Sequence, residues 1–393
     1  MKFPYIKVLF VSVLFLLLST ASASAATYYI SPTGNDTSGN GSISTPWKTL
    51  RKACTTVSGA GDIIHINAGT YQETEQCFLA VGVSIEGEGN TSVIKNNWPW
   101  SYQAAIALES SQEGTNGNQH LSNFKFDGDN LTTRRAISVL GRSNVSVHDI
   151  TLVDVKEEGI VFSGTYSFTG AAPAIYATGN TFYNNNFNNC SMYAGFGTGC
   201  LGIGGQDGML IYGNTIVQPQ RSGSQIGWPI KYYNEGWLKG VKIYNNIITK
   251  APWNGEGWNF SMELFNQSGM EIYGNTIQGA LDFNYQTKGN YAYSVYIHDN
   301  TITEPYFNPY TESGVIIEYG FDGFWIENNI FKNLSTGVSF YSRPDAYITD
   351  FRFTKNLVTN VGMSNDGVGF FIGGLGVGAS RYYIDGFKVL NNT

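Results

Sequence analysis

Four ionisable residues occupy equivalent positions in four similar segments of this chain, WPIKYYN, FSMELFN, ALDFNYQ and GVIIEYG. They are Lys231, Glu263, Asp282 and Glu318, and the apolar residues expected to point inward beside them are Ile230, Met262, Leu281 and Ile317. Successive side chains of a β-strand point to opposite faces, so burying the apolar residues would direct the charged ones outward. If the segments stack, the four form one polar column on the outer surface.

The carboxylate pair Glu263 and Asp282 would suit hydrolysis of a glycosidic bond. Stacked strands lie roughly 4.8 Å apart, and carboxyl groups about 5 Å apart are typical of retaining glycosidases. Lys231 lies beside Glu263 and would favour its ionised form, which suits a nucleophile. Asp282 would lie between two carboxylates, which should make it hold its proton more tightly, as a general acid requires. The sequence therefore predicts a glycoside hydrolase acting on a polysaccharide.

Three alternatives stay open for this column. A polysaccharide lyase would use Lys231 or Tyr233 to abstract a proton beside a uronic acid, although the acidic column would repel such a substrate. A non-catalytic glycan-binding adhesin would use the surface without cleaving anything. The column could also be a solvated charge ladder, in which Lys231 and Glu263 form an ordinary surface pair.

Aromatic residues gather around the same segments. Four of the eight tryptophans fall between positions 228 and 258, namely Trp228, Trp237, Trp253 and Trp258. Flat aromatic faces pack against sugar rings with a large contact area, so these tryptophans, with Tyr233 and Asp207, are the expected substrate-binding residues. The alternative for each tryptophan is burial in the core.

Repeated short phrases indicate what must position these residues. IYGNTI and its variants recur at intervals of 25 to 36 residues, and the fourth position of each phrase is asparagine. The asparagines are Asn180, Asn214, Asn246, Asn275, Asn300, Asn329, Asn356 and Asn392. Such a period is typical of a solenoid. We expect each asparagine to adopt the left-handed conformation of a sharp turn and the set to stack as a hydrogen-bonded ladder.

The segments before the ladder extend the same pattern. SNFKFDG from 122 and SNVSVHDITL from 143 align with each other and lack a ladder asparagine at Ile150. DIIHINAGTYQET and VSIEGEG read as the first strands. PWKTLRKACTTV predicts a short amphipathic helix with Trp47, Leu50 and Ala53 on one side, which would cap the exposed end of a solenoid.

Together these features resemble the pectate-lyase-like right-handed parallel β-helix superfamily of carbohydrate-active proteins. The likeness rests on YYISPTGNDTSGNGSISTPWKTLRKAC, on GDIIHINAGTYQET and on the asparagine-marked repeats. It implies an all-β, right-handed parallel β-helix with a short N-terminal capping helix. The Asp-Asp pair of polygalacturonases and the Asp-Pro-His-Asp motif of mannuronan epimerases are missing, so the resemblance carries neither activity over.

The first 26 residues read as a signal peptide, with Lys2 and Lys7 before an apolar stretch and small residues near Ala26. We expect residues 27–393 to form one β-helix domain, secreted or periplasmic, without membrane insertion and monomeric. VLNNT ends in mid-repeat, so we expect a truncated chain or a missing C-terminal cap. Without the signal peptide, 21 basic and 30 acidic residues leave a formal charge of −9, which argues against nucleic acid.

The remaining reactive residues suggest little further chemistry. In an oxidising compartment Cys190 and Cys200 are expected to form a disulfide, whereas Cys54 and Cys77 could be bridged or free. His148 and His298 hold matching places five coils apart, so they cannot act together. No zinc spacing is present, and we expect no required cofactor. Calcium stays an alternative because carboxylates and turn carbonyls are suitable ligands.

Overall fold

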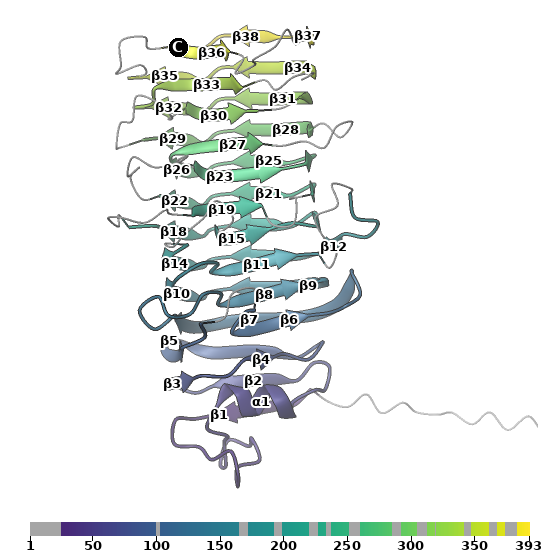
Figure 1. Ribbon diagram of the computed structural model, residues 1–393, viewed down its shortest axis with the longest axis vertical. Coiled ribbons are helices and arrows are strands. Elements are labelled where there is room, and N and C mark those ends of the chain that lie inside the picture. Colours follow the sequence, from purple (N-terminus) through teal and green to yellow (C-terminus); the bar gives the residue numbers. More distant parts are fainter. Residues whose placement is uncertain are drawn as a thin grey trace, which may run out of the picture.

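The chain folds into a parallel β-helix whose coils stack along one long axis (Figure 1). The computed structural model describes residues 25–99, 103–164, 172–191, 199–219, 227–232, 237–250, 260–284, 292–304, 313–318, 320–341, 347–360, 368–373 and 383–393. All named strand pairs in these ranges are parallel, as expected when each coil lies on the one before it. The all-β architecture predicted from the repeats is confirmed.

One wall of the helix is an 11-stranded sheet that takes one strand from each of eleven coils. Its labels rise in order from β4 to β36 in Figure 1. The strands are β4 Cys77–Phe78, β6 Ile106–Glu109, β8 Ile137–Leu140, β11 Ile160–Ser163, β15 Gly199–Ile203, β19 Trp228–Tyr232, β23 Phe260–Phe265, β27 Ala280–Asn284, β30 Ser313–Ile317, β33 Thr336–Tyr341 and β36 Val368–Gly373.

The other strands form a 27-stranded sheet that bends around the rest of each coil. They are β1 Thr27–Ile30, β2 Ile63–Ile66, β3 Gly69–Glu73, β5 Ser84–Asn96, β7 Thr115–Asp127, β9 Arg142–His148, β10 Thr151–Val155, β12 Ala177–Thr178, β13 Thr181–Tyr183, β14 Asn186–Cys190, β16 Gln206–Asp207, β17 Leu210–Tyr212, β18 Thr215–Val217, β20 Leu238–Lys239, β21 Lys242–Tyr244, β22 Ile247–Thr249, β24 Gln267–Ser268, β25 Glu271–Tyr273, β26 Thr276–Gln278, β28 Ala292–His298, β29 Thr301–Thr303, β31 Phe321–Glu327, β32 Ile330–Lys332, β34 Tyr347–Thr354, β35 Leu357–Thr359, β37 Tyr383–Asp385 and β38 Lys388–Leu390.

Columns of identical apolar residues fill the interior. Ile211, Ile243, Ile272, Ile297 and Ile326 lie one above another in β17, β21, β25, β28 and β31, and all are buried. Full burial of such a side chain contributes roughly 1.5 to 3 kcal/mol. The repeated apolar letters of the sequence are therefore the core of the solenoid.

The asparagine ladder is confirmed, except that Asn185 takes the place that was expected for Asn180. Side-chain amides link Asn214, Asn246, Asn275, Asn300, Asn329, Asn356 and Asn392 in consecutive coils at 2.9–3.1 Å. The residue that continues this column below Asn214 is Asn185, not Asn180, because Phe182 pairs with Ile211. Asn180 instead donates to Gln206 in a neighbouring turn. The expected gap at Ile150 is confirmed, since its amide donates to Asn185.

The left-handed conformation belongs to the residue before each ladder asparagine, so that part of the expectation was wrong. Gly213, Asn245, Gly274 and Asp299 have φ of 66°, 55°, 64° and 56°. A Cβ on Gly274 would lie 2.4 Å from Asn245 Oδ1, so the turns of adjacent coils touch here. The ladder position requires asparagine because its side-chain amide both donates and accepts hydrogen bonds. The position before it requires a residue that tolerates the left-handed turn.

Register in the early coils also differs from the expected alignment. Leu121 pairs with Val147 and Phe126 with Leu152, so LSNFKF lies against VHDITL. The expected alignment matched the two Ser-Asn dipeptides instead and was wrong by five residues. Apolar residues that share a core column decide the register, and surface dipeptides do not.

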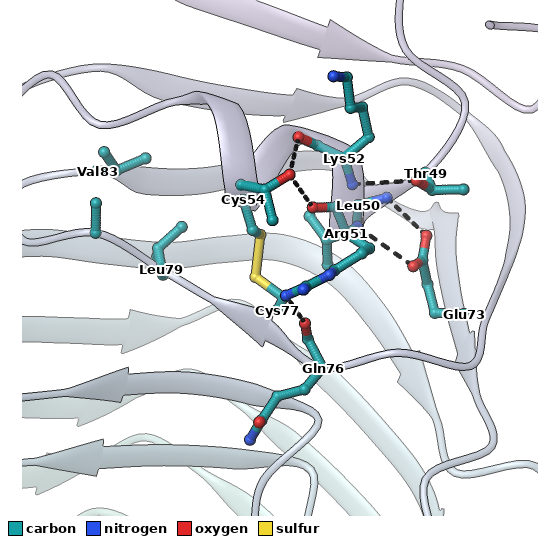
Figure 2. The surroundings of a disulfide bond; sticks show 12 residues. Thr49, Leu50, Arg51, Lys52, Cys54, Glu73, Gln76, Cys77, Leu79 and Val83 are labelled. Atoms are coloured by element: carbon teal, nitrogen blue, oxygen red, sulfur yellow. Dashed lines mark hydrogen bonds between the residues drawn. A yellow bond between two sulfur atoms is a disulfide. The ribbon is translucent and has the colours of Figure 1, made fainter. Parts of the chain in front are cut away.

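The N-terminal end is closed by helix α1, Leu50–Thr56, as predicted (Figure 1). Leu50 and Ala53 are buried together with Trp47, which precedes the helix. Figure 2 shows Thr49 capping the helix through Lys52 N and the Glu73 carboxylate accepting from Leu50 N at 2.6 Å. The first strand is β1, which lies one strand earlier than expected and pairs with β2.

Two disulfides fasten the coils. The predicted bond between Cys190 and Cys200 is present and joins β14 to β15. Cys54 and Cys77, which the sequence left undecided, are also bonded and attach α1 to β4, as Figure 2 shows. Both bonds suit an oxidising compartment.

Candidate functional site

Three of the four residues in the predicted polar column stack in consecutive coils of the 11-stranded sheet. Lys231 in β19 pairs with Glu263 in β23, and Glu263 pairs with Asp282 in β27. The expected inward column is confirmed beside it for Ile230, Met262 and Leu281.

Glu318 does not belong to this column. Asp282 pairs with Ile316, and Phe283 pairs with Ile317, so Glu318 lies two residues further along its coil. Its backbone amide donates to the Phe283 carbonyl. The sequence alignment placed Ile317 above Leu281, whereas Val315 holds that position. A shift of two residues preserves which face a side chain points to, so alternation along the strand could not reveal the error.

The three stacked residues are buried, which corrects the expected exposed column. The exposed fractions are 2% for Lys231, 6% for Glu263 and 0% for Asp282. Lys231 Nζ forms an ion pair with Glu263 Oε2 and lies 4.1 Å from the centre of the Trp228 ring. Burial lowers the pKa of Lys231 to about 7, and the charge of Asp282 opposes part of this shift. A lysine in this state can exchange a proton near neutral pH.

A second group of apolar residues lies beside the column. Trp228, Phe260, Ala280 and Ile316 form a second buried apolar cluster, separate from the core of the solenoid. Ile316 itself is the next member of the column above Asp282. The charged residues are buried and have apolar neighbours, so electrostatic interactions between them are stronger than in water.

Glycines make room below the column. Gly202 pairs with Lys231, and a Cβ on Gly199 would lie 2.8 Å from the Lys231 Cβ. A larger residue at Gly199 would press on the lysine stem, and a Cβ on Gly202 would lie 3.2 Å from Val161 Cγ2 in the coil below. The coil of β15 is therefore shaped to accept Lys231.

Of the aromatic residues expected to bind substrate, the structure describes Trp228 and Trp237. Trp228 and Trp237 are 3% and 6% exposed, so the expectation that their faces are open to a sugar ring was wrong. Trp228 packs instead against Phe260 and Lys231. Tyr233, Trp253 and Trp258 lie outside the described residues.

Asp207 lies away from the column. It belongs to β16 in the 27-stranded sheet and pairs with Lys239, whose Nζ is 2.8 Å from Asp207 Oδ2. The tight Gly-Gly turn after Ile203 carries the chain out of the 11-stranded sheet before Asp207 is reached. Asp207 therefore does not lie beside the column, where it had been expected.

The sequence reasoning missed a buried ion pair near this wall. Lys250 Nζ lies 2.7 Å from Glu304 Oε2, and both residues are buried. The pair spans two coils across Gly279, where a Cβ would meet the Lys250 side chain at 2.0 Å. Both residues directly follow strands that pair through β26, so the strand register is the signal that could have found them.

A stacked column of rings on the outer face of the 27-stranded sheet was also missed. It consists of His148, Tyr183, Tyr212, Tyr244, Tyr273 and His298, with ring centres 4.7–5.0 Å apart. The second letter of the repeated phrase encodes its tyrosines. The expectation that His148 and His298 lie five coils apart is confirmed.

Within the described ranges, no three His, Cys, Asp or Glu side chains come together as metal ligands. The calcium alternative therefore stays a prediction without a site. Among the described residues no helix is both long and apolar enough to span a bilayer.

Comparison with known proteins places the chain among β-helix structures. A family model described as "Right handed beta helix region" matches residues 173–353. Among solved structures, XylC in complex with xylose is 12% identical, with a TM-score of 0.51, over 84% of this chain and 75% of XylC.

A second similar structure is the catalytic unit of a thermostable GH87 α-1,3-glucanase from Streptomyces thermodiastaticus strain HF3-3. It is 16% identical, with a TM-score of 0.51, over 94% of this chain and 69% of the glucanase chain. A search of curated proteins finds no match. At these identities the likeness shows the fold, which is the right-handed parallel β-helix expected from the sequence.

Proposed function

We propose that this right-handed parallel β-helix is an exported carbohydrate-active enzyme that hydrolyses glycosidic bonds of a polysaccharide. The observation that carries the proposal is the stack of Lys231, Glu263 and Asp282 in consecutive coils of one sheet, all of them buried. A retaining glycosidase needs two carboxyl groups about 5 Å apart, which is the spacing expected for carboxylates one coil apart.

Burial of these charges supports a functional role. Removing an ion pair from water costs several kcal/mol per ion before the attraction between the partners is counted. Apolar residues occupy the same column above and below, at Ile316 and Val161, so the fold does not require charge at these positions. Ionisable groups kept under such conditions cluster at functional sites.

The roles follow from the neighbours of each carboxylate. Glu263, paired with Lys231, is the nucleophile: it attacks the anomeric carbon and forms a glycosyl ester. Asp282 donates its proton to the leaving oxygen, and the glycosidic bond breaks. Water then attacks the ester, with the Asp282 carboxylate accepting its proton, and Glu263 is released. Because all three side chains are enclosed, the reaction requires a conformation in which the substrate reaches them.

The similar structures are compatible with this proposal. The α-1,3-glucanase acts on a glucan, and XylC was solved with bound xylose. Both proteins therefore bind or act on carbohydrates and share this fold, although a shared fold alone does not establish a shared activity.

Incubation with a panel of polysaccharides tests the reaction class. New reducing ends without ultraviolet absorbance identify hydrolysis. Absorbance from an unsaturated uronate identifies a lyase, and retention without products identifies binding alone. Soaking crystals with the active oligosaccharide should place a sugar within hydrogen-bonding distance of Glu263 and Asp282. A sugar bound far from this column would overturn the site.

One observation favours a lyase as the second candidate. The pKa of Lys231 is lowered to about 7, so its neutral form is accessible as a proton-abstracting base. Against this role, Glu263 and Asp282 would repel the carboxylate of a uronic acid. The hydrolase is therefore the conclusion, and the lyase requires a cation that reverses the local charge.

We also propose export, with residues 1–26 removed as a signal peptide. The first strand, β1, starts at Thr27, directly after the expected cleavage boundary, and Ala26 N donates to Asp62 Oδ1 at 2.9 Å. Two disulfides favour an oxidising location. We propose that the protein acts as a monomer.

A further inference from the structure

An open hollow of about 590 Å³ lies on the outer face of the 27-stranded sheet, away from the Lys231 column. Its lining includes Glu86 from β5, His120 from β7, His148 from β9 and Tyr183 from β13. Glu86, Ser122, His148 and Tyr183 occupy one register position in four successive coils. The hollow opens at Ser122, where this column lacks a large side chain.

Irregular strand pairing shapes the hollow. The pairing of β7 with β9 shifts between Asn116 and Gln119, and that of β5 with β7 shifts after Glu86. Asn118 and Asn123, which also line the hollow, have left-handed φ of 45° and 57°. Such bulges turn side chains away from the regular ladder and are frequent beside functional sites.

Both imidazoles keep one nitrogen for a ligand. His120 Nε2 lies 2.6 Å from Glu86 Oε1, and His148 Nδ1 lies 2.7 Å from Asp149 Oδ2. His120 Nδ1 and His148 Nε2 have no hydrogen-bond partner among the described residues, and the same holds for the amides of Asn118 and Asn123. A carboxylate bound to one ring nitrogen fixes the ring and sets the role of the other.

The lining chemistry indicates the ligand class. Side-chain amides and imidazoles donate and accept hydrogen bonds and a carboxylate accepts them, as the hydroxyl groups of a sugar require. Among the described residues, no lysine or arginine lines the hollow, which argues against a phosphate or a uronate. The described residues form no metal site, so a cation does not explain the cluster.

We infer that this hollow is a binding site for a neutral oligosaccharide segment, separate from the proposed catalytic column. His148 and Glu263 lie four coils apart, roughly 20 Å along the axis, and on different sheets. A site at this place would hold a polymer chain on the protein without taking part in cleavage. The ligand class rests on the lining residues and not on the proposed hydrolysis.

Affinity electrophoresis in native gels tests the inference, with arabinoxylan and dextran as neutral probes and alginate and polygalacturonate as anionic ones. At least one neutral polymer should retard the wild-type protein. His120→Ala should raise the dissociation constant for that polymer about tenfold or more, because it removes ring contacts and leaves Glu86 without its partner. Turnover of a short oligosaccharide should stay unchanged.

His65→Ala is the matched control. His65 pairs with Glu88 at 3.3 Å in a neighbouring coil but does not line the hollow, so this variant should bind like the wild type. If His120→Ala does not fold, Glu86→Ala carries the same expectation. Glu263→Gln should lose hydrolysis and keep the retardation.

Three results would overturn the inference: no retardation by either neutral polymer, retardation by the anionic polymers alone, or equal affinities of His120→Ala and the wild type. Retardation that depends on His120 in a protein that cleaves nothing would support the hollow and reject the proposed hydrolysis. Hydrolysis with binding that does not depend on His120 would do the reverse.

Discussion

Glu263 and Asp282 share one column of the 11-stranded sheet, whereas Glu318 lies two residues beyond that column. Comparing substitutions at these three residues is the sharpest test at the scale of single residues. Glu263→Gln and Asp282→Asn should each lower the hydrolysis rate at least about 100-fold, because each removes a positioned nucleophile, acid or base. Steady-state kinetics on the substrate found in the panel measures the loss. Thermal unfolding of each variant checks that the fold survives.

Glu318→Gln is the control for that prediction. Glu318 is buried directly after β30 and lies two positions away from the column, so turnover by Glu318→Gln should remain within about twofold of the wild type. Full activity in Glu263→Gln, or a loss in Glu318→Gln as large as in Asp282→Asn, would show that the column is not the catalytic site.

The asparagine ladder makes a prediction at the scale of a structural element. Asn246 Oδ1 accepts from the amide and side chain of Asn214, and Asn246 Nδ2 donates to Ile211 O and Asn275 Oδ1. Asn246→Ala leaves these buried groups unpaired and should lower the free energy of unfolding by about 2 to 4 kcal/mol.

Denaturant unfolding measures this effect, and Thr276→Ala is the control. Thr276 lies exposed on the strand after a ladder turn, so its loss should change the free energy of unfolding by less than about 0.5 kcal/mol. Equal effects of the two substitutions would mean that the ladder adds little to stability.

The N-terminal cap should respond to pH through Glu73. Burial raises the pKa of Glu73 to about 7 from 4.5, against the two backbone amides of Leu50 and Arg51 that favour the charged form. The folded state therefore holds this proton more tightly than the unfolded state. Its contribution to stability is complete below about pH 4.5 and is lost as the pH rises through about 7.

The midpoint of thermal unfolding should accordingly be higher at pH 5 than at pH 8, with Glu73 supplying on the order of 2 kcal/mol of the difference. Glu73→Gln cannot titrate and should flatten the profile over this range. An unchanged pH profile in that variant would assign the dependence to other groups.

At the scale of the whole molecule, the export proposal predicts the mature N-terminus. Secreted protein should begin at Ala26 or Thr27, because cleavage there follows the small residues near Ala26 and leaves β1, Thr27–Ile30, intact. Intact-mass measurement of the product under non-reducing conditions should also show four fewer hydrogens than the free-thiol chain, since both cysteine pairs are bonded. Secreted protein that retained residues 1–26 would contradict the cleavage.

The sequence by itself determined the architecture, because a solenoid repeats its local signals. The fourth-position asparagines, the isoleucines beside them and the helix after Pro46 each encode one element whose neighbour is the next copy of itself. Lys231, Glu263 and Asp282 could be stacked correctly for the same reason: one apolar residue before each of them points into the core.

Only the tertiary structure decided register and burial where the repeats lose their regularity. Glu318 lies outside the column, and Asn185 holds the ladder position expected for Asn180, because loops of unequal length join the strands. Core packing then decides which residues of neighbouring coils align. Trp228 and the charged column are buried, and Trp228 packs against Phe260 and Lys231, which alternation along the strand does not reveal. The hollow at His120 arises where strand pairing shifts, and residue spacing does not encode such a shift, since it depends on how neighbouring coils fit together.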